Sequence, residues 1–162
     1  MQPVLGLLTS LSVLSMESNN IGEIPVHLSS LRHLEALGVD DNQIMIIANE
    51  IGLLTKLTTL NLADNILSEL PTSLGDLSQL TALNVENNHI RHMPEELGKL
   101  KQLQALYLGD NDIEEIPFWV PHLSSLTELS LDCCQLTVIP STLANLSNLR
   151  SLNRKLYSRS YS

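Results

Sequence analysis

The sequence predicts an α/β solenoid, in which short parallel strands stack into one sheet and short helical segments lie on the opposite side. Three observations predict this fold. A leucine-rich unit repeats every 23 residues along almost the whole chain. Each unit contains a short stretch in which apolar and polar residues alternate, as they do in a half-buried strand. A proline follows this stretch in five of the six units, and apolar residues at helical spacing come after it.

The strand of each unit is marked by the pattern LxxLxL, whose first leucine we number position 1. Positions 1 and 4 hold leucine in every unit, and position 6 holds Met, Val or Leu. One strand per unit, repeated in the same direction, predicts a parallel sheet with neighbouring strands about 4.8 Å apart. The leucines at position 1 are Leu11, Leu34, Leu57, Leu80, Leu103, Leu126 and Leu149.

Position 9 predicts a ladder of side-chain hydrogen bonds where the chain leaves the strand. An asparagine amide can both donate to and accept from the backbone of neighbouring coils. Cysteine replaces asparagine in the sixth unit and is the usual alternative at this position, so we expect Cys134 to pack rather than to react. The predicted ladder residues are Asn19, Asn42, Asn65, Asn88, Asn111 and Cys134.

Position 15 marks the point at which the chain turns away from the sheet. It holds proline except in the second unit, where Ala48 stands. Proline fixes φ and has no N–H for a sheet, so the strand cannot continue. Positions 18 and 21 are apolar, and this i, i+3 spacing predicts a short 3₁₀ or helical turn on the outer side. The outer segment is wider than the strand, so the sheet should lie on the concave side of the stack.

These units resemble those of leucine-rich repeat proteins, specifically the 23-residue, IP-containing type of the Ras group. Similar repeats occur in Ras-signalling scaffolds, in the Scribble and Erbin family and in plant intracellular relatives. The resemblance implies a leucine-rich repeat solenoid that recognises other proteins. It divides the chain into a partial repeat at 1–10, six full repeats at 11–148, and an incomplete repeat with a basic, disordered tail at 149–162. Such an irregular end is typical of a fragment or a truncated isoform.

Composition excludes several function classes. The chain has 162 residues, 43% of them hydrophobic, and 9 Lys and Arg against 18 Asp and Glu, for a net charge of −9. This charge argues against nucleic acid or an anionic membrane as the main partner. No apolar run approaches the roughly 20 residues of a membrane-spanning helix. The apolar start of the chain has no Lys or Arg before Arg32, so it does not read as a signal peptide, and we expect a cytoplasmic protein.

Catalytic chemistry has no signature in the sequence. No phosphate-binding glycine loop, nucleophile elbow or HExxH motif occurs. His89 and His92 form an HxxH pair without a third ligand at metal-site spacing, so we expect surface histidines. We therefore predict no enzyme activity, no metal and no cofactor.

The strongest functional signal is the distribution of charge over the strands. We call the solvent-facing residues at positions 3, 5, 7 and 8 the concave face. No Lys or Arg occupies repeat positions 2 to 10 in any of the six full units. The charged side chains among the 13 residues after Leu149 are all basic. Acidic residues alone can keep a surface soluble, but the exclusion of one sign from a whole face favours a protein partner with a basic surface. The predicted partner-binding residues are Glu17, Asp40, Asp41, Asp64, Asn84, Glu86, Tyr107, Asp110, Glu128 and Asp132.

Aromatic residues are few, so their positions are informative. Tyr107 is the only one on the concave face, near its middle, where an anchor would contribute most. Phe118 and Trp119 follow Pro117 on the outer side. They could be a second contact or a cover for the coil, and we favour the cover.

These observations predict a protein–protein interaction module that acts as a scaffold or adaptor in intracellular signalling. Two alternatives stay open: the recognition part of a larger kinase, GTPase or ubiquitin-ligase protein, and a fragment of an extracellular receptor. Neither end shows a polar residue that would cover the last coil, so weak self-association through the ends is also expected.

Overall fold

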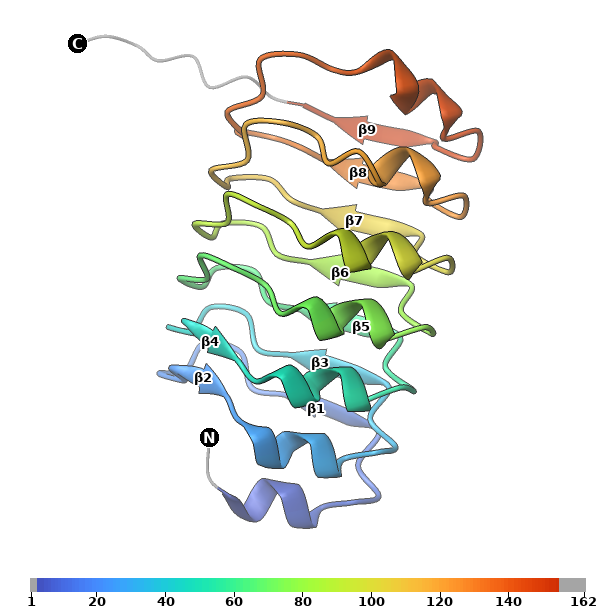
Figure 1. Cartoon of the computed structure of the whole chain (residues 1–162). Helices are drawn as coiled ribbons and strands as arrows, with labels where there is room; N and C mark the ends of the chain where they lie inside the picture. Colours follow the sequence, from blue (N-terminus) through green and yellow to red (C-terminus); the bar gives the residue numbers. More distant parts are fainter. Residues whose placement is uncertain (1–2, 155–162) are drawn as a thin grey trace, which may run out of the picture.

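The computed structural model describes residues 3–154. These residues form one continuous stack of coils, and each full coil contributes one strand to the main sheet (Figure 1). Seven strands make one parallel sheet in the order β1-β3-β5-β6-β7-β8-β9. They are β1 (Val13–Ser15), β3 (Ala36–Gly38), β5 (Thr59–Asn61), β6 (Ala82–Asn84), β7 (Ala105–Tyr107), β8 (Glu128–Ser130) and β9 (Ser151–Asn153).

The register of the sheet follows the repeat. Leu14 pairs with Leu37, Leu37 with Leu60, and the same 23-residue step continues to Leu152. Position 4 is therefore a continuous column of leucines, and from Leu37 to Leu129 this column is almost completely buried. The predicted solenoid with a parallel sheet is confirmed.

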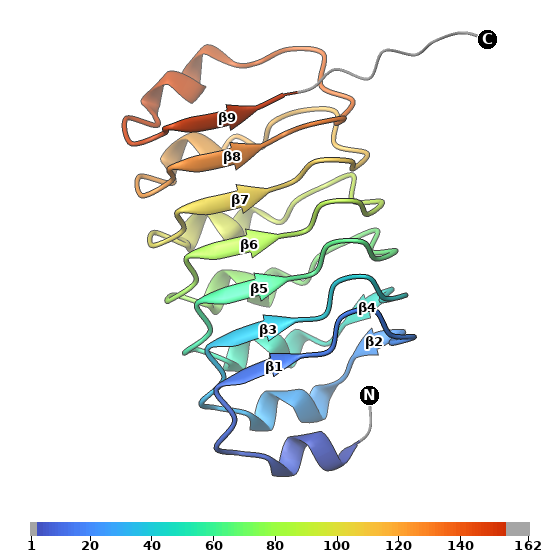
Figure 2. The same cartoon turned by 180° about the vertical axis from the view of Figure 1, so that it is seen from behind.

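Short 3₁₀ helices form the opposite side of the stack, as the view from behind makes clear (Figure 2). In the first of the turns that follow a proline, the Leu31 N–H donates to the Leu28 carbonyl, so positions 18 and 21 close the turn that their spacing predicts. Four of the prolines at position 15, namely Pro25, Pro71, Pro94 and Pro140, directly precede a 3₁₀ helix with extended backbone. The helices are η1 (Pro3–Leu7), η2 (Val26–Ser30), η3 (Asn49–Leu53), η4 (Thr72–Asp76), η5 (Glu95–Lys99), η6 (Val120–His122) and η7 (Ser141–Asn145).

The core lies between the sheet and these helices and is almost entirely aliphatic. Trp119 is the exception, because its ring is buried against the core with 4% of its surface exposed. Phe118 beside it is 71% exposed. The two aromatic residues therefore do not act as a pair: Trp119 covers the coil, as favoured from the sequence, and Phe118 does not.

A second, two-stranded sheet was not predicted. It pairs β2 (Glu23–Ile24) with β4 (Ile46–Ile47) on the flank between the main sheet and the 3₁₀ helices. The Ala48 N–H donates to the Ile24 carbonyl at 2.9 Å. Proline, which occupies this position in the other five units, has no N–H to make that bond. The single departure from proline therefore extends the pairing at this flank.

The C-terminal coil carries a polar group that the sequence did not lead us to expect. Arg154 occupies position 6, where the other units bury an apolar side chain, and its guanidinium donates to the Leu136 carbonyl at 3.0 Å. This half-buried arginine satisfies a backbone oxygen of the preceding coil. It does not cover the last strand, because Leu152 of β9 is 41% exposed. The predicted tail at 155–162 lies outside the described residues.

Candidate functional site

The concave face is built by the alternation of the strands. In β5 the Leu60 side chain points into the core, while Thr59 and Asn61 on either side of it point outward. The same alternation in each strand aligns positions 3 and 5 into columns, 23 residues apart in sequence and adjacent in space. Figure 2 looks onto this side of the sheet.

Position 8 forms the turn at the edge of the concave face. All six residues at this position have a left-handed backbone, with φ between 52° and 55°. Asn and Asp adopt this conformation more readily than other non-glycine residues. Asp41, Asp64 and Asp110, predicted as partner contacts, therefore also have a backbone role. The six residues are Ser18, Asp41, Asp64, Asn87, Asp110 and Cys133.

Position 9 forms the hydrogen-bond ladder just inside this turn. The Asn65 carbonyl oxygen accepts from the Ile44 N–H at 2.8 Å, and its amide nitrogen donates to the carbonyls of Val39, Leu62 and Ala63. Asn42, Asn88 and Asn111 make the equivalent set of bonds, and all four side chains are buried. Each asparagine thus joins its own coil to the preceding one.

The two ends of the ladder differ from its middle. Asn19 is exposed and donates only within its own turn, to Met16 and Glu17. Cys134 donates its thiol to the Leu108 carbonyl at 3.3 Å. Burial raises the pKa of Cys134 to about 11, so the group stays a thiol at neutral pH. This environment fits packing and does not fit a nucleophile.

Several carboxylates of the concave face are held by neighbouring polar side chains. Asp40 accepts from the Asn61 amide at 2.8 Å. Ser15 donates to Glu17, and this hydrogen bond lowers the pKa of that exposed carboxyl. Asp64 accepts from the Asn87 amide. These bonds orient the carboxylates and leave their negative charge at the surface.

One of these contacts spans two coils. The Ser130 hydroxyl, almost completely buried, donates to the Glu86 carboxylate at 2.6 Å. Gly109 lies between them: a Cβ there would come within 3.0 Å of a Glu86 carboxylate oxygen and 3.3 Å of the Ser130 oxygen. Sequence reasoning missed Gly109 and Ser130. The glycine at position 7, where four of the other five full units hold Asp or Glu, was the available signal.

Tyr107 belongs to the same cluster. Its hydroxyl donates to Glu128 at 2.6 Å, and this bond, with partial burial and the charges of Glu128 and Glu86, raises the pKa of Tyr107. Asn84 accepts the Glu86 N–H at 3.0 Å, and half-buried Asp132 lies beyond Gly109, one coil further on. The structure thus brings Asn84, Glu86, Tyr107, Glu128 and Asp132 together over β6 to β8. Glu17 and Asp40 lie apart from them, at the N-terminal end of the face.

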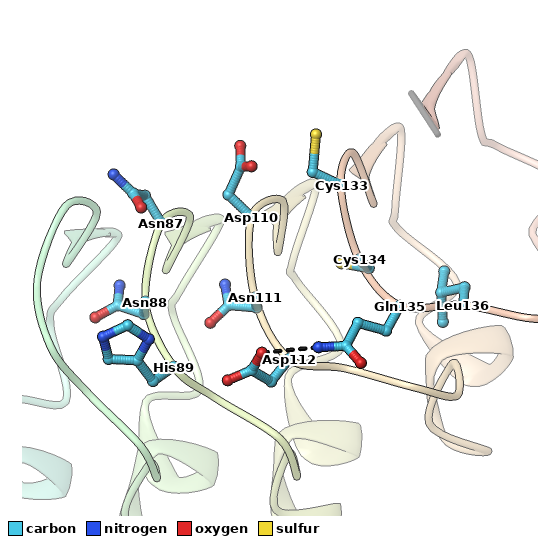
Figure 3. Close-up of a pocket in the computed structure, with 10 residues that line it drawn as sticks. All are labelled: Asn87, Asn88, His89, Asp110, Asn111, Asp112, Cys133, Cys134, Gln135 and Leu136. Carbon is cyan, nitrogen blue, oxygen red and sulfur yellow. Dashed lines mark hydrogen bonds between the residues drawn. The ribbon is translucent and has the colours of Figure 1, made fainter. Parts of the chain in front are cut away.

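Two hollows open on this side of the molecule. One, of about 320 Å³, lies over the first strands around Gly38 and is lined by Ser15, Glu17, Asp40 and Asn61 among others. The other, of about 720 Å³, follows the turn edge of the fourth to sixth coils. Figure 3 shows its rows of position 8, 9 and 10 side chains, with Asp110 and Cys133 pointing outward and Asn111 pointing inward.

Within residues 3–154 two further kinds of feature are absent. No helix in this range is long and apolar enough to cross a membrane. In the same range no group of three or more His, Cys, Asp and Glu side chains is placed to hold a metal ion.

Sequence profiles of known families identify the repeats. The profile described as a leucine-rich repeat region matches residues 72–161, and the single leucine-rich repeat profile matches 10–31 and 56–77. The chain belongs to the leucine-rich repeat family. A search of curated proteins finds no significant match to this chain.

Solved structures of other repeat proteins share the fold. A leucine-rich repeat protein of Leptospira interrogans is 34% identical with a TM-score of 0.91, and the alignment covers 96% of this chain and 41% of that protein. The ectodomain of the plant membrane receptor kinase GASSHO1/SCHENGEN3 from Arabidopsis thaliana, solved in complex with CASPARIAN STRIP INTEGRITY FACTOR 2, is 35% identical with a TM-score of 0.82, covering 95% of this chain and 19% of that one. A plant peptide hormone receptor, RGFR1, solved in complex with RGF2, is 28% identical with a TM-score of 0.76, covering 96% and 30%. The chain thus spans less than half of each of these proteins.

Proposed function

We propose that this chain is a protein-recognition module that binds a basic segment of its partner on the concave face. Leucine-rich repeat domains generally mediate protein–protein interaction. The observation that supports a basic partner is the arrangement of Asp40, Glu86 and Glu128, whose carboxylates are held in place by Asn61, Ser130 and Tyr107. Charges oriented before binding lose less conformational freedom when a partner arrives.

The partner contacts would be divided along the face. The N-terminal hollow around Gly38 has room for a side chain between Glu17 and Asp40. The cluster at Tyr107 offers an aromatic ring beside Glu128 and Glu86, an arrangement that suits a guanidinium through charge and stacking. Scaffold or adaptor action in cytoplasmic signalling, of the Ras-group type, is the setting we propose for this recognition.

A second candidate function is peptide recognition within a larger receptor. It is supported by the two plant receptors solved with bound partners, which share the fold over nearly the whole of this chain. The two settings can be distinguished by adding a membrane-impermeant protease to intact cells and detecting this chain with an antibody. The protease should degrade the chain if it is part of an extracellular receptor and leave it intact if it is cytoplasmic.

The experiment for the concave face is selection of binding peptides from a random phage-displayed library against the whole chain. We expect enrichment of Lys and Arg, and a loss of association rate as salt rises, because the screening length near physiological ionic strength is about 8 Å. A neutralised variant, with Asp40→Asn, Glu86→Gln and Asp110→Asn, should bind the selected peptides at least tenfold more weakly. Asparagine is chosen at position 110 because it tolerates the left-handed backbone there.

The matched control neutralises two carboxylates of η5 on the opposite side, with Glu95→Gln and Glu96→Gln. This variant should bind as the wild type does. Tyr107→Ala should mainly speed dissociation, as expected for a packed anchor. Peptides that bind the concave variants normally and fail on the η5 variant would show that the proposed face is wrong.

A further inference from the structure

Three aliphatic side chains are exposed together on the flank that carries the second sheet. Met45 is 60% exposed, Ile46 62% and Ile66 41%. Met45 and Ile46 are neighbours in sequence, and the Ile66 N–H donates to the Ile44 carbonyl at 3.2 Å, which places Ile66 beside them on the next coil. We call these three residues the flank patch.

Among the six full units, only the second has apolar residues at both positions 12 and 13. Positions 12 and 13 hold Met45 and Ile46 in the second coil, whereas the coils on either side have Gly22 and Glu23, and Ser68 and Glu69. The Met45 and Ile46 side chains do not contribute to the core, because the buried residues of this segment are Ile44 and Ile47. Contiguous exposed apolar side chains rimmed by polar ones mark interaction sites in soluble proteins.

The backbone beneath the patch is already hydrogen-bonded. The Met45 N–H donates to the Gly22 carbonyl at 3.0 Å and the Ala48 N–H to the Ile24 carbonyl at 2.9 Å, so β4 is paired with β2 on one side and lies against the third coil on the other. An extended partner strand would have to fit between β4 and the third coil, whose Ile66 N–H already donates to the Ile44 carbonyl. A helix satisfies its own backbone and needs only side-chain contact.

Charge at the margins decides the chemistry of the partner. Ile46 pairs in register with Glu23, and Glu69 holds the same position in the following coil. Both glutamates are exposed. An apolar centre with an acidic rim is complementary to an apolar stripe with basic margins.

We propose that the flank patch binds an amphipathic helix whose apolar stripe is bordered by Lys or Arg. This site is separate from the concave face and does not depend on its function. The small size of the patch suits a transient contact or a second contact made by a partner that is anchored elsewhere.

The test uses two lactam-bridged helical peptides with the same leucine stripe at i, i+3, i+4 and i+7, one with Lys margins and one with Glu margins. Binding to the whole chain is followed by methyl NMR of its Met and Ile side chains. The Lys peptide should shift the Met45, Ile46 and Ile66 signals saturably, and the Glu peptide should bind about tenfold more weakly or worse.

Variants at matched positions separate this site from others. Ile46→Ser should weaken the Lys peptide about tenfold, whereas Val138→Ser, at the same repeat position in the sixth coil and 67% exposed, should have no effect. The concave variant with Asp40→Asn, Glu86→Gln and Asp110→Asn should also leave this binding unchanged. No saturable shift at the three methyl groups, or equal binding to wild type and Ile46→Ser, overturns the proposal and leaves the concave-face proposal intact.

Discussion

Single side chains join the coils at position 9. Asn65 replaces four backbone partners at once, and each of its bonds lies inside the protein, where water cannot substitute. A side chain that serves both its own coil and the preceding one is therefore a link in the stack as well as a cap for a turn. The same residue type at the exposed first position has less to satisfy.

Removal of an inner ladder residue should destabilise the protein. We expect Asn65→Ala or Asn88→Ala to lower the free energy of unfolding by roughly 1–3 kcal/mol, because buried N–H and C=O groups lose their partners. Asn19→Ala is the control and should cost less, since Asn19 is exposed and bonds only within its own turn. Denaturant unfolding measures the three values, and equal midpoints for all three variants would exclude the ladder role.

Restoration of the ladder at its irregular position should have the opposite effect. Cys134→Asn should stabilise the protein by about 1 kcal/mol, because the amide offers two donors and a good acceptor where the thiol makes one weak bond. The comparison of thermal unfolding at pH 7 shows the sign. A destabilised variant would mean that the sixth turn no longer has the geometry that the amide needs.

The same pair of proteins tests the thiol itself. The pKa of Cys134 is raised from an ordinary 9.0 to about 11, so the unfolded chain loses this proton first. The contribution to stability is fully present below about pH 9 and is lost as pH rises toward 11. The stability advantage of Cys134→Asn over the wild type should therefore be constant below pH 9 and grow above it in denaturant titrations. A difference that stays flat to pH 11 contradicts this assignment.

Between elements, the outer helices pack through glycines. Gly75 in η4 lies so close to the η5 segment that a Cβ would come within 2.7 Å of the Glu96 carbonyl carbon. Gly22, in contrast, has no heavy atom within 4 Å of such a Cβ. The spacing of neighbouring coils on the outer side is therefore set by residues that add nothing to the hydrophobic pattern.

These two glycines make a matched pair for mutation. Gly75→Ala should destabilise by roughly 1–3 kcal/mol, because the backbone of η5 must move to admit the methyl group. Gly22→Ala should be neutral or stabilise by up to about 1 kcal/mol, since the unfolded chain loses freedom and nothing clashes. Unfolding midpoints decide the matter, and equal costs at both sites would contradict this packing.

Across the whole molecule, stability should vary along the stack. Most contacts of a coil are with its direct neighbours, so an inner coil is held from both sides and an outer coil from one. Net charge is also uneven, because the strands carry an acidic face and the basic residues before Leu149 lie in turns or on the outer side. Because the outer coils are held from one side only, local opening is easiest at the two ends.

Hydrogen exchange measures this gradient. Amides of β5, β6 and β7 should exchange most slowly, and those of residues 3–20 and 149–154 fastest. Arg154→Ala should speed exchange of the last coil further, because the Leu136 carbonyl loses its donor. Uniform exchange along the stack would show that the chain unfolds only as one cooperative unit.

The repeat by itself determined the fold, the strands of the main sheet, their register and the aliphatic residues of the core. A period of 23 with leucines at fixed positions can bury its apolar side chains in only one way, so the geometry of one coil is the geometry of all. The ladder at position 9 and the outer turns at positions 18 and 21 followed from the same local chemistry. The acidic face could be predicted because strand alternation decides which side chains point outward.

Only the tertiary structure decided what happens where the repeat is broken or where coils two apart meet. Glu86 reaches Ser130 across Gly109 because a missing side chain leaves a path, and no period in the sequence relates residues 44 apart in that way. Ala48 extends a second sheet because its N–H is free to donate to the preceding coil. Trp119 is buried and Phe118 exposed because adjacent residues in a turn point to opposite sides. Contacts of this kind depend on the distance between coils and on the side chains of other coils, and the sequence of a single unit contains neither.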